Sequence, residues 1–150
     1  LIYVPLLSFT LVSESPLLPS DEVVTQDQIL ESDIAFLQQK QLLPPNETIN
    51  YFYSDAVLSV RDDGHGFTDE RIFSYWKDEN EQFNSEMVTF DQVKDLKVKF
   101  AENESANTVI TVIRRDDSEF MLFIAAINGK DRLFFNKLKA LWRKQNLSQL

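Results

Sequence analysis

The densest group of residues that could carry out chemistry lies near the middle of the chain. It comprises Asp62, Asp63, His65 and Asp69, with Asp55 shortly before them. Carboxylates next to an imidazole could bind a divalent metal ion or supply a general acid and base for hydrolysis. The segment Asp-Asp-Gly-His-Gly also has the composition of a hairpin loop, and it lacks the ligand spacing of a calcium loop. We predict a hairpin loop here and keep a metal-assisted hydrolase based on Asp62, Asp63 and His65 as the weakest functional hypothesis.

The composition removes most other kinds of catalytic site. The 150 residues contain no Cys and a single His, which excludes disulfide frameworks, thiolate metal sites, cysteine nucleophiles and clusters of histidine ligands. No nucleophile can be paired with a base. The sequence therefore predicts a protein that is not an enzyme, with no catalytic residues, no metal site and no cofactor.

The charge is distributed unevenly along the chain. The net charge is −9, but residues 1–93 carry 4 basic and 17 acidic side chains, whereas residues 94–150 carry 11 basic and 7 acidic ones. An acidic surface repels the phosphates of nucleic acids and of anionic lipids, so nucleic acid is not an expected partner. Only the C-terminal third could supply a local anion-binding face.

Basic and aromatic side chains are the candidate binding residues. Arg71 could pair with a phosphate, although its neighbours Asp69 and Glu70 favour an ion pair within the protein. Aromatic residues on strands could anchor a partner, although most such residues pack in a core. The full set of candidates is Arg71, Tyr53, Tyr75, Trp76, Lys97, Lys99, Arg114 and Arg115.

The elements that must position these residues are mostly strands. From Glu47 to Ala126 the apolar residues recur with period two and are rich in aromatic and β-branched types, with turn-forming residues between short runs. The pattern predicts antiparallel strands over residues 49–54, 56–61, 66–76, 85–90, 93–100, 107–114 and 118–126.

Two helices are expected on either side of this sheet region. Apolar residues at helical spacing predict a helix over residues 25–43, capped by Thr25 or Ser20 and ended by Pro44 and Pro45. A wide apolar stripe predicts a second helix over residues 130–145.

The chain begins with an apolar run over residues 1–12, which is too short for a bilayer that needs roughly 20 residues. An extended linker over residues 13–22 follows. The run is either the end of a membrane anchor or signal segment, or a strand packed on the domain. An anchor would place the domain outside the cytoplasm, because no Lys or Arg precedes Lys40, and a cytoplasmic location is the alternative. The expected units are an arm and linker (1–22), an N-terminal helix (23–45) and a domain (46–150).

Seven short antiparallel strands followed by one amphipathic helix resemble the order of elements in pleckstrin-homology-like (PH-like) barrels. The segment Thr68-Asp69-Glu70-Arg71-Ile72-Phe73-Ser74-Tyr75 is similar to a strand motif of bacterial PH-like domains, and Phe90-Asp91-Gln92-Val93-Lys94-Asp95-Leu96 is similar to their step into the fifth strand. The resemblance covers about residues 46–145. It implies a mainly β (α+β) fold, in which a C-terminal helix covers one end of two nearly orthogonal sheets, here with an extra N-terminal helix.

The resemblance also bears on function, because PH-like domains are recognition scaffolds without a common chemistry. We expect a non-catalytic recognition or assembly module that binds a protein partner or itself, with an anionic ligand or a membrane surface bound through the basic C-terminal third as the alternative. A phosphoinositide is not expected. In lipid-binding PH domains the basic residues cluster between the first two strands, and the expected junction here, Ser54-Asp55, has neither Lys nor Arg. If the partner is a protein, we expect membrane contact only through an upstream anchor.

Overall fold

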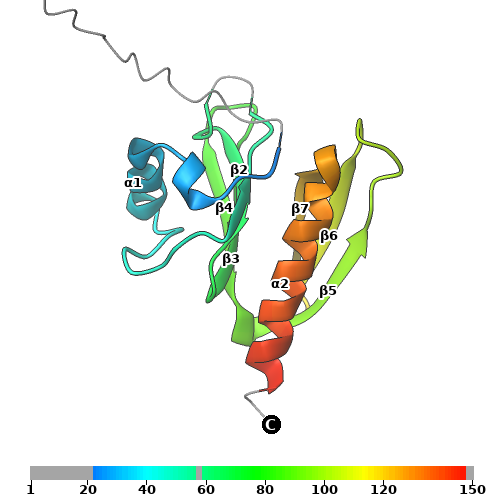
Figure 1. Cartoon of the computed structure of the whole chain (residues 1–150). Coiled ribbons are helices and arrows are strands. Elements are labelled where there is room, and N and C mark those ends of the chain that lie inside the picture. Colours follow the sequence, from blue (N-terminus) through cyan, green and yellow to red (C-terminus); the bar gives the residue numbers. More distant parts are fainter. Residues whose placement is uncertain (1–21, 57–58, 148–150) are drawn as a thin grey trace, which may run out of the picture.

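The computed structural model describes residues 22–56 and 59–147. Seven strands form two antiparallel sheets in which each strand pairs with the next along the chain (Figure 1). Sheet A contains β1 (Tyr51–Tyr53), β2 (Asp63–Phe67), β3 (Arg71–Lys77) and β4 (Phe83–Thr89), and sheet B contains β5 (Val93–Lys99), β6 (Asn107–Arg114) and β7 (Glu119–Ala125). Two α-helices, α1 (Glu31–Gln39) and α2 (Lys130–Leu147), and the short 3-10 helices η1 (Gln26–Gln28), η2 (Phe90–Gln92) and η3 (Ile127–Gly129) complete the fold.

The inner core lies between the two sheets and α2. Phe67 and Ile72 from sheet A meet Ile110 and Leu122 from sheet B, and all four are fully buried. The helix α2 closes this core with Phe134, whose ring lies edge-on to the ring of Phe67 with the centroids 4.8 Å apart. The amphipathic stripe predicted for the C-terminal helix is therefore the surface that seals the space between the sheets.

An outer core covers the other face of sheet A. Phe52, Phe73 and Tyr75 project from the sheet and pack against Leu37 of α1, and against Leu43 in the turn that follows α1. Figure 1 shows α1 on the side of sheet A that faces away from sheet B. Sheet A is thus buried on both faces, whereas sheet B has one face on the inner core and one face that no helix or turn of residues 22–56 and 59–147 covers in the same way.

The count of seven strands is confirmed, but the second and third strands differ from the prediction. The expected strand over residues 56–61 is wrong, because the described residues of that segment form a loop and a turn. The expected strand over residues 66–76 is instead two strands, β2 and β3, joined by the turn at residues 68–70. The predicted hairpin loop Asp-Asp-Gly-His-Gly is also wrong, since four of its five residues belong to β2.

Close packing explains why glycine occurs twice in β2. A Cβ atom on Gly64 would lie 2.5 Å from the hydroxyl of Tyr75, and one on Gly66 would lie 2.6 Å from the ring of Phe73. Neither glycine has a positive φ. The glycines make room for aromatic side chains of the outer core, which is a role of glycine in strands that is easily mistaken for a turn signal.

The N-terminal helix is shorter than the predicted span of residues 25–43. Thr25 and Gln28 form a reciprocal capping box on η1, and α1 ends at Gln39, well before the prolines. Gln41 has a positive φ of 60°, and the amide of Leu42 donates to the carbonyl of Leu37 at 3.0 Å. The apolar residues after α1 that continued the helical spacing therefore belong to the turn that ends the helix.

The first described residues are attached to the rest of the molecule by a backbone bridge and an ion pair. Val24 pairs with Phe52 in an antiparallel bridge, and Glu22 forms an ion pair with Lys130 at the start of α2. The apolar run over residues 1–12 lies outside the described residues. Among the helices of the described chain, none is long and apolar enough to cross a membrane.

Candidate binding surfaces

The acidic residues and the histidine predicted as a chemical group engage separate partners. Asp62 pairs with Lys77 at 2.9 Å, whereas Asp63 accepts a hydrogen bond from the backbone amide of Asp55 at 3.4 Å. The His65 ring is buried, with Nδ1 2.9 Å from the hydroxyl of Ser74. Within residues 22–56 and 59–147, no three His, Asp or Glu side chains are placed to hold a metal ion.

Burial shifts the protonation of this region. It lowers the pKa of His65 to about 4, against a smaller opposing effect of Asp55. Burial, together with the neighbouring carboxyl group of Asp55, raises the pKa of Asp63 to about 7. The imidazole is therefore neutral at physiological pH and packed into the protein, where a substrate in solution does not reach it.

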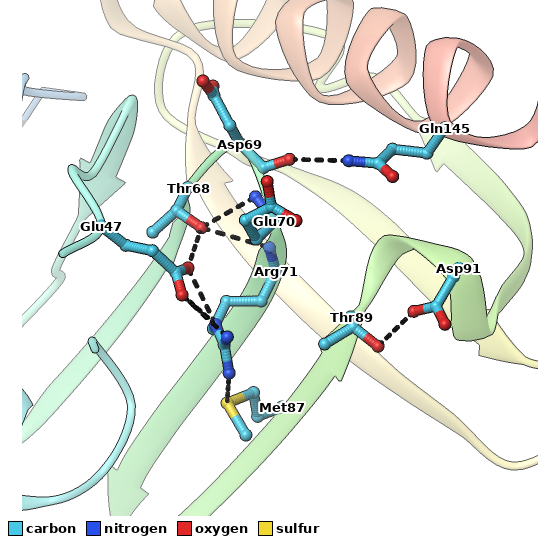
Figure 2. A network of polar contacts seen from close by, with 9 residues as sticks. All are labelled: Glu47, Thr68, Asp69, Glu70, Arg71, Met87, Thr89, Asp91 and Gln145. Atoms are coloured by element: carbon cyan, nitrogen blue, oxygen red, sulfur yellow. Dashed lines mark hydrogen bonds and ion pairs between the residues drawn. The ribbon is translucent and has the colours of Figure 1, made fainter. Parts of the chain in front are cut away.

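Arg71 is held by the protein itself (Figure 2). Its guanidinium contacts both oxygens of the Glu47 carboxylate, with the closest pair 2.7 Å apart, and the Thr68 hydroxyl donates to the same carboxylate at 2.6 Å. The Thr68 hydroxyl also accepts the amides of Glu70 and Arg71 at 3.0 and 3.2 Å. This network fixes the tight turn between β2 and β3, and Arg71 pairs with Glu47 instead of its sequence neighbours Asp69 and Glu70.

The aromatic candidates are divided between core and surface. Tyr53 and Tyr75 are buried, with 6% and 0% of their surface exposed, and the Tyr75 hydroxyl donates to the carbonyl of Val60. Burial raises the pKa of Tyr75 above its usual range. Trp76 is 40% exposed near the end of β3 and is the one candidate ring of the three that a partner could reach.

The basic candidates also lie in different parts of the structure. Arg114 points toward sheet A and pairs with Glu86 of β4, and its guanidinium lies over the ring of Phe120. Lys97 and Lys99 are exposed on the face of sheet B that points away from the inner core. Arg115 follows β6 and lies beside the last turns of α2.

Sequence analysis missed the residues that accompany Lys97 and Lys99. Across the sheet, Lys97 lies in register with Thr111 and Met121, and Lys99 with Val109 and Phe123. Met121 and Phe123 are 45% and 42% exposed, although β7 is an apolar run. The ring of Phe123 also meets that of His65, with the centroids 6.2 Å apart, where β7 approaches β2. We call the face formed by Lys97, Lys99, Val109, Thr111, Met121 and Phe123 the open face of sheet B.

A groove lies at the C-terminal end of α2. Its volume is about 520 Å³, and its lining consists of Lys94, Arg115, Trp142, Arg143, Asn146 and Leu147. Trp142 donates its indole N–H to the carbonyl of Val93 at 3.0 Å, which fixes the orientation of the ring. Of the predicted site residues, Arg115 alone contributes to this groove.

The junction between β1 and β2 is longer than the sequence indicated. It spans residues 54–62 and includes one basic residue, Arg61, which pairs with Asp33 at 3.1 Å. The same segment contains Asp55 and Asp62. The predicted lack of a basic cluster at this position therefore holds for the longer segment, although the predicted two-residue junction is wrong.

Comparisons with known proteins identify the fold. No protein-family model matches the chain, and no curated protein matches it by sequence. Among solved structures, it is similar to a DUF1696-family protein with a pleckstrin-homology domain from Shewanella loihica, at 14% identity and a TM-score of 0.51, over 82% of this chain and 96% of that one. It is also similar to a pleckstrin-homology domain from Shewanella amazonensis, at 17% identity and a TM-score of 0.50, over 75% and 96% of the two chains. The predicted PH-like fold is confirmed.

Proposed function

We propose that this PH-like domain is a non-catalytic recognition module that binds a protein partner on the open face of sheet B. The observation that carries the proposal is that the outer faces of the two sheets differ in how much of them is covered. The outer face of sheet A is covered by residues of α1 and the following turn, whereas Met121 and Phe123 on sheet B stay 45% and 42% exposed. Exposed apolar residues that lie together on a rigid face are typical of protein interaction sites.

The charges on this face indicate what the partner presents. Lys97 and Lys99 border the apolar residues on the β5 side, in register with the rows that end at Met121 and Phe123. An amphipathic element with apolar residues along one side and carboxylates along its edge would complement both features. Such a partner would bury the apolar rows and bring its carboxylates to the lysines, which favours correct orientation more than affinity.

Met121→Glu tests the proposal, with Met87→Glu as its matched control. Both residues are exposed methionines on strands, at 45% and 38%, but Met87 lies on β4 of sheet A. The Met87 sulfur accepts a hydrogen bond from Arg71 at 3.6 Å, so the stability of the control variant is measured as well. Immobilised wild-type protein and both variants would be exposed to the same cell extract, and bound proteins would be quantified by mass spectrometry. We expect Met121→Glu to reduce capture of a specific partner at least tenfold and Met87→Glu to leave it unchanged.

Two further measurements complete the experiment. Thermal unfolding checks that Met121→Glu keeps the stability of the parent to within about 0.5 kcal/mol, as expected for an exposed position. Sedimentation velocity asks whether the partner is a second copy, in which case Met121→Glu dissociates an oligomer that Met87→Glu retains. Equal capture and equal sedimentation by all three proteins would contradict the proposal.

A further inference from the structure

We infer that the groove at the C-terminal end of α2 is a second binding site, for a segment of a protein that carries carboxylates next to an apolar side chain. The inference is independent of the proposed function, because the groove lies between α2 and the beginning of β5 and shares no residue with the open face of sheet B. It rests on how the cationic side chains of the groove are held.

Arg115 is oriented by neutral groups. Its Nε donates to the backbone carbonyl of Asp91 at 2.6 Å, and its Nη2 donates to the side-chain oxygen of Asn146 at 3.0 Å. The carboxylate of Asp91 is itself bound by the Thr89 hydroxyl at 2.5 Å, and this hydrogen bond is the main cause of its lowered pKa. The guanidinium is therefore fixed in place and no carboxylate of the described residues is hydrogen-bonded to it, although its charge also contributes to the lowered pKa of the nearby Asp91.

The two least exposed arginines that form ion pairs are held differently. Arg71 is bonded to Glu47 and Arg114 to Glu86, so in both cases a carboxylate inside the protein compensates the charge. A guanidinium oriented by a carbonyl and an amide still offers N–H groups to an incoming carboxylate, in the fork geometry that arginine provides. Arg115 is thus prepared for an external anion in a way that Arg71 and Arg114 are not.

Two further cations line the same groove. Lys94 pairs with Asp117 at 2.5 Å, but the side chains are 55% and 73% exposed, so the pair is weak and can exchange for a ligand. The side chain of Arg143 is exposed and forms no hydrogen bond or ion pair with any described residue. Three positive side chains therefore surround a groove whose wall is the fixed indole ring of Trp142 and the side chain of Leu147.

The surroundings favour a protein segment over a membrane surface. Asp69 and Glu70 line a smaller cavity on the other side of the last turns of α2, and Asp116 and Asp117 are exposed in the turn after β6. These carboxylates and the net charge of −9 repel an extended anionic surface. A single chain can enter the groove between them and place an apolar side chain on Trp142.

Intrinsic fluorescence provides a direct test. The chain has two tryptophans, and Trp76→Phe leaves Trp142 as the one reporter inside the groove. In this background the peptide acetyl-Asp-Glu-Leu-Asp-Glu-amide would be titrated, with acetyl-Asn-Gln-Leu-Asn-Gln-amide as the uncharged control. We expect saturable binding of the acidic peptide, at least tenfold weaker binding of the control, and loss of affinity as NaCl is raised from about 0.05 to 0.5 M.

Variants assign the binding to the groove. We expect Arg115→Gln to weaken the acidic peptide about tenfold, as for the loss of a charge-assisted hydrogen bond. Arg143→Gln removes a cation whose side chain has no hydrogen bond or ion pair with the described residues, so we expect it to weaken binding without altering the fold. Arg132→Gln is the matched control, because it makes the same change on an exposed arginine of α2 outside the groove. It leaves the affinity unchanged.

Three outcomes of the peptide titrations would overturn the inference. These are equal affinity for both peptides, an acidic-peptide affinity that Arg115→Gln and Arg143→Gln leave unchanged, and full displacement of the peptide by 10 mM inorganic phosphate. Vesicles of phosphatidylcholine and phosphatidylglycerol at 3:1 that bind through Arg115 while the peptide does not would assign the groove to a membrane instead.

Discussion

The ion pair between Glu47 and Arg71 shows how much a single side chain can contribute to this fold. Its two side chains are 10% and 20% exposed, and they connect the segment before β1 to the start of β3. Truncating one partner leaves the other charge in a site that excludes most of the water, which costs far more than the net gain from forming such a pair.

We predict that Arg71→Ala lowers the free energy of unfolding by about 2–4 kcal/mol, because Glu47 would lose its counter-charge. Urea unfolding followed by circular dichroism would measure it. Lys94→Ala is the control, since the pair that it removes is exposed and should contribute about 0.5 kcal/mol or less. Equal losses in both variants would refute a special role for the Glu47 pair.

His65 makes stability depend on pH in a defined direction. Burial lowers its pKa to about 4, from 6.5 in an unfolded chain. The unfolded state therefore binds the proton first, so the stabilising contribution is complete above about pH 6.5 and is lost as the pH falls toward 4. Because the chain has one histidine, NMR titration of its ring protons would give this pKa without ambiguity. A midpoint near 6.5 would contradict the buried, neutral state.

Asp63 acts in the opposite direction within the same pH range. Its pKa is raised to about 7 from 3.8, so its contribution to stability is present at low pH and is lost as the pH rises through 7. We expect Asp63→Asn to be more stable than the parent at pH 8 and to show the acid destabilisation by His65 more clearly between pH 6.5 and 4. Thermal unfolding at a series of pH values in both proteins would separate the two groups.

At the scale of elements, how well a strand could be predicted depends on how many of its faces are buried. The predicted ranges for β5, β6 and β7 agree with the structure to within one residue at each end, because polar turns over residues 101–106 and 115–118 separate the three strands and inward and outward residues alternate in β5. In β3, the four consecutive residues from Ile72 to Tyr75 are buried, since sheet A has a core on each side. The alternation of apolar and polar residues that locates a strand is absent there, so the sequence did not show where β2 ends and β3 begins.

The same principle limited the prediction of the two proposed binding surfaces. Met121 and Phe123 belong to a run that is apolar at every position but the first, so the sequence could not show which residues point outward. The groove combines Arg115, which follows β6, with Trp142 and Arg143 of α2, and only the packing of the helix brings them together. Residue types could identify Arg115 as a candidate, but its neutral hydrogen-bond partners are visible only in three dimensions.

The glycines of β2 provide a prediction for an element. Gly66→Ala places a Cβ atom 2.6 Å from the ring of Phe73 and 3.2 Å from that of Phe52. We expect a loss of about 1–3 kcal/mol in the free energy of unfolding from overpacking of the outer core. Combining it with Phe73→Leu should recover part of the loss, because a smaller side chain vacates the space. A double variant whose losses simply add would show that the contact with Phe73 is not the cause.

For the whole molecule, the layer formed by α1 and the following turn keeps the aromatic residues on the outer face of sheet A away from solvent. Phe52, Phe73 and Tyr75 are at most 2% exposed beneath it, and all three would face solvent in a chain that begins at Asn46. We predict that this truncated PH-like portion aggregates or binds the dye ANS strongly, unlike the full chain. Fluorescence of ANS at equal protein concentration would measure the difference. A stable, monomeric truncation without dye binding would show that the N-terminal layer is dispensable.

A less severe change tests the same layer within the full chain. Leu37 is the buried residue of α1 and is 1% exposed. Leu37→Ala should cost about 2–4 kcal/mol, as for other leucines in well-packed cores, and should leave the inner core intact. The ring contact between Phe67 and Phe134 would report on that core through NMR shifts.

The two cores also differ in when they can form during synthesis. The outer core is assembled from residues between Val24 and Phe83, whereas the inner core needs α2 and is not complete until Leu138 has been made. Since domains emerge from the ribosome N-terminus first, the outer face of sheet A can be covered while its inner face still awaits a partner. For the time needed to add the last third of the chain, the nascent protein therefore presents Phe67 and Ile72 to its surroundings, and this is the interval in which a chaperone would protect it best.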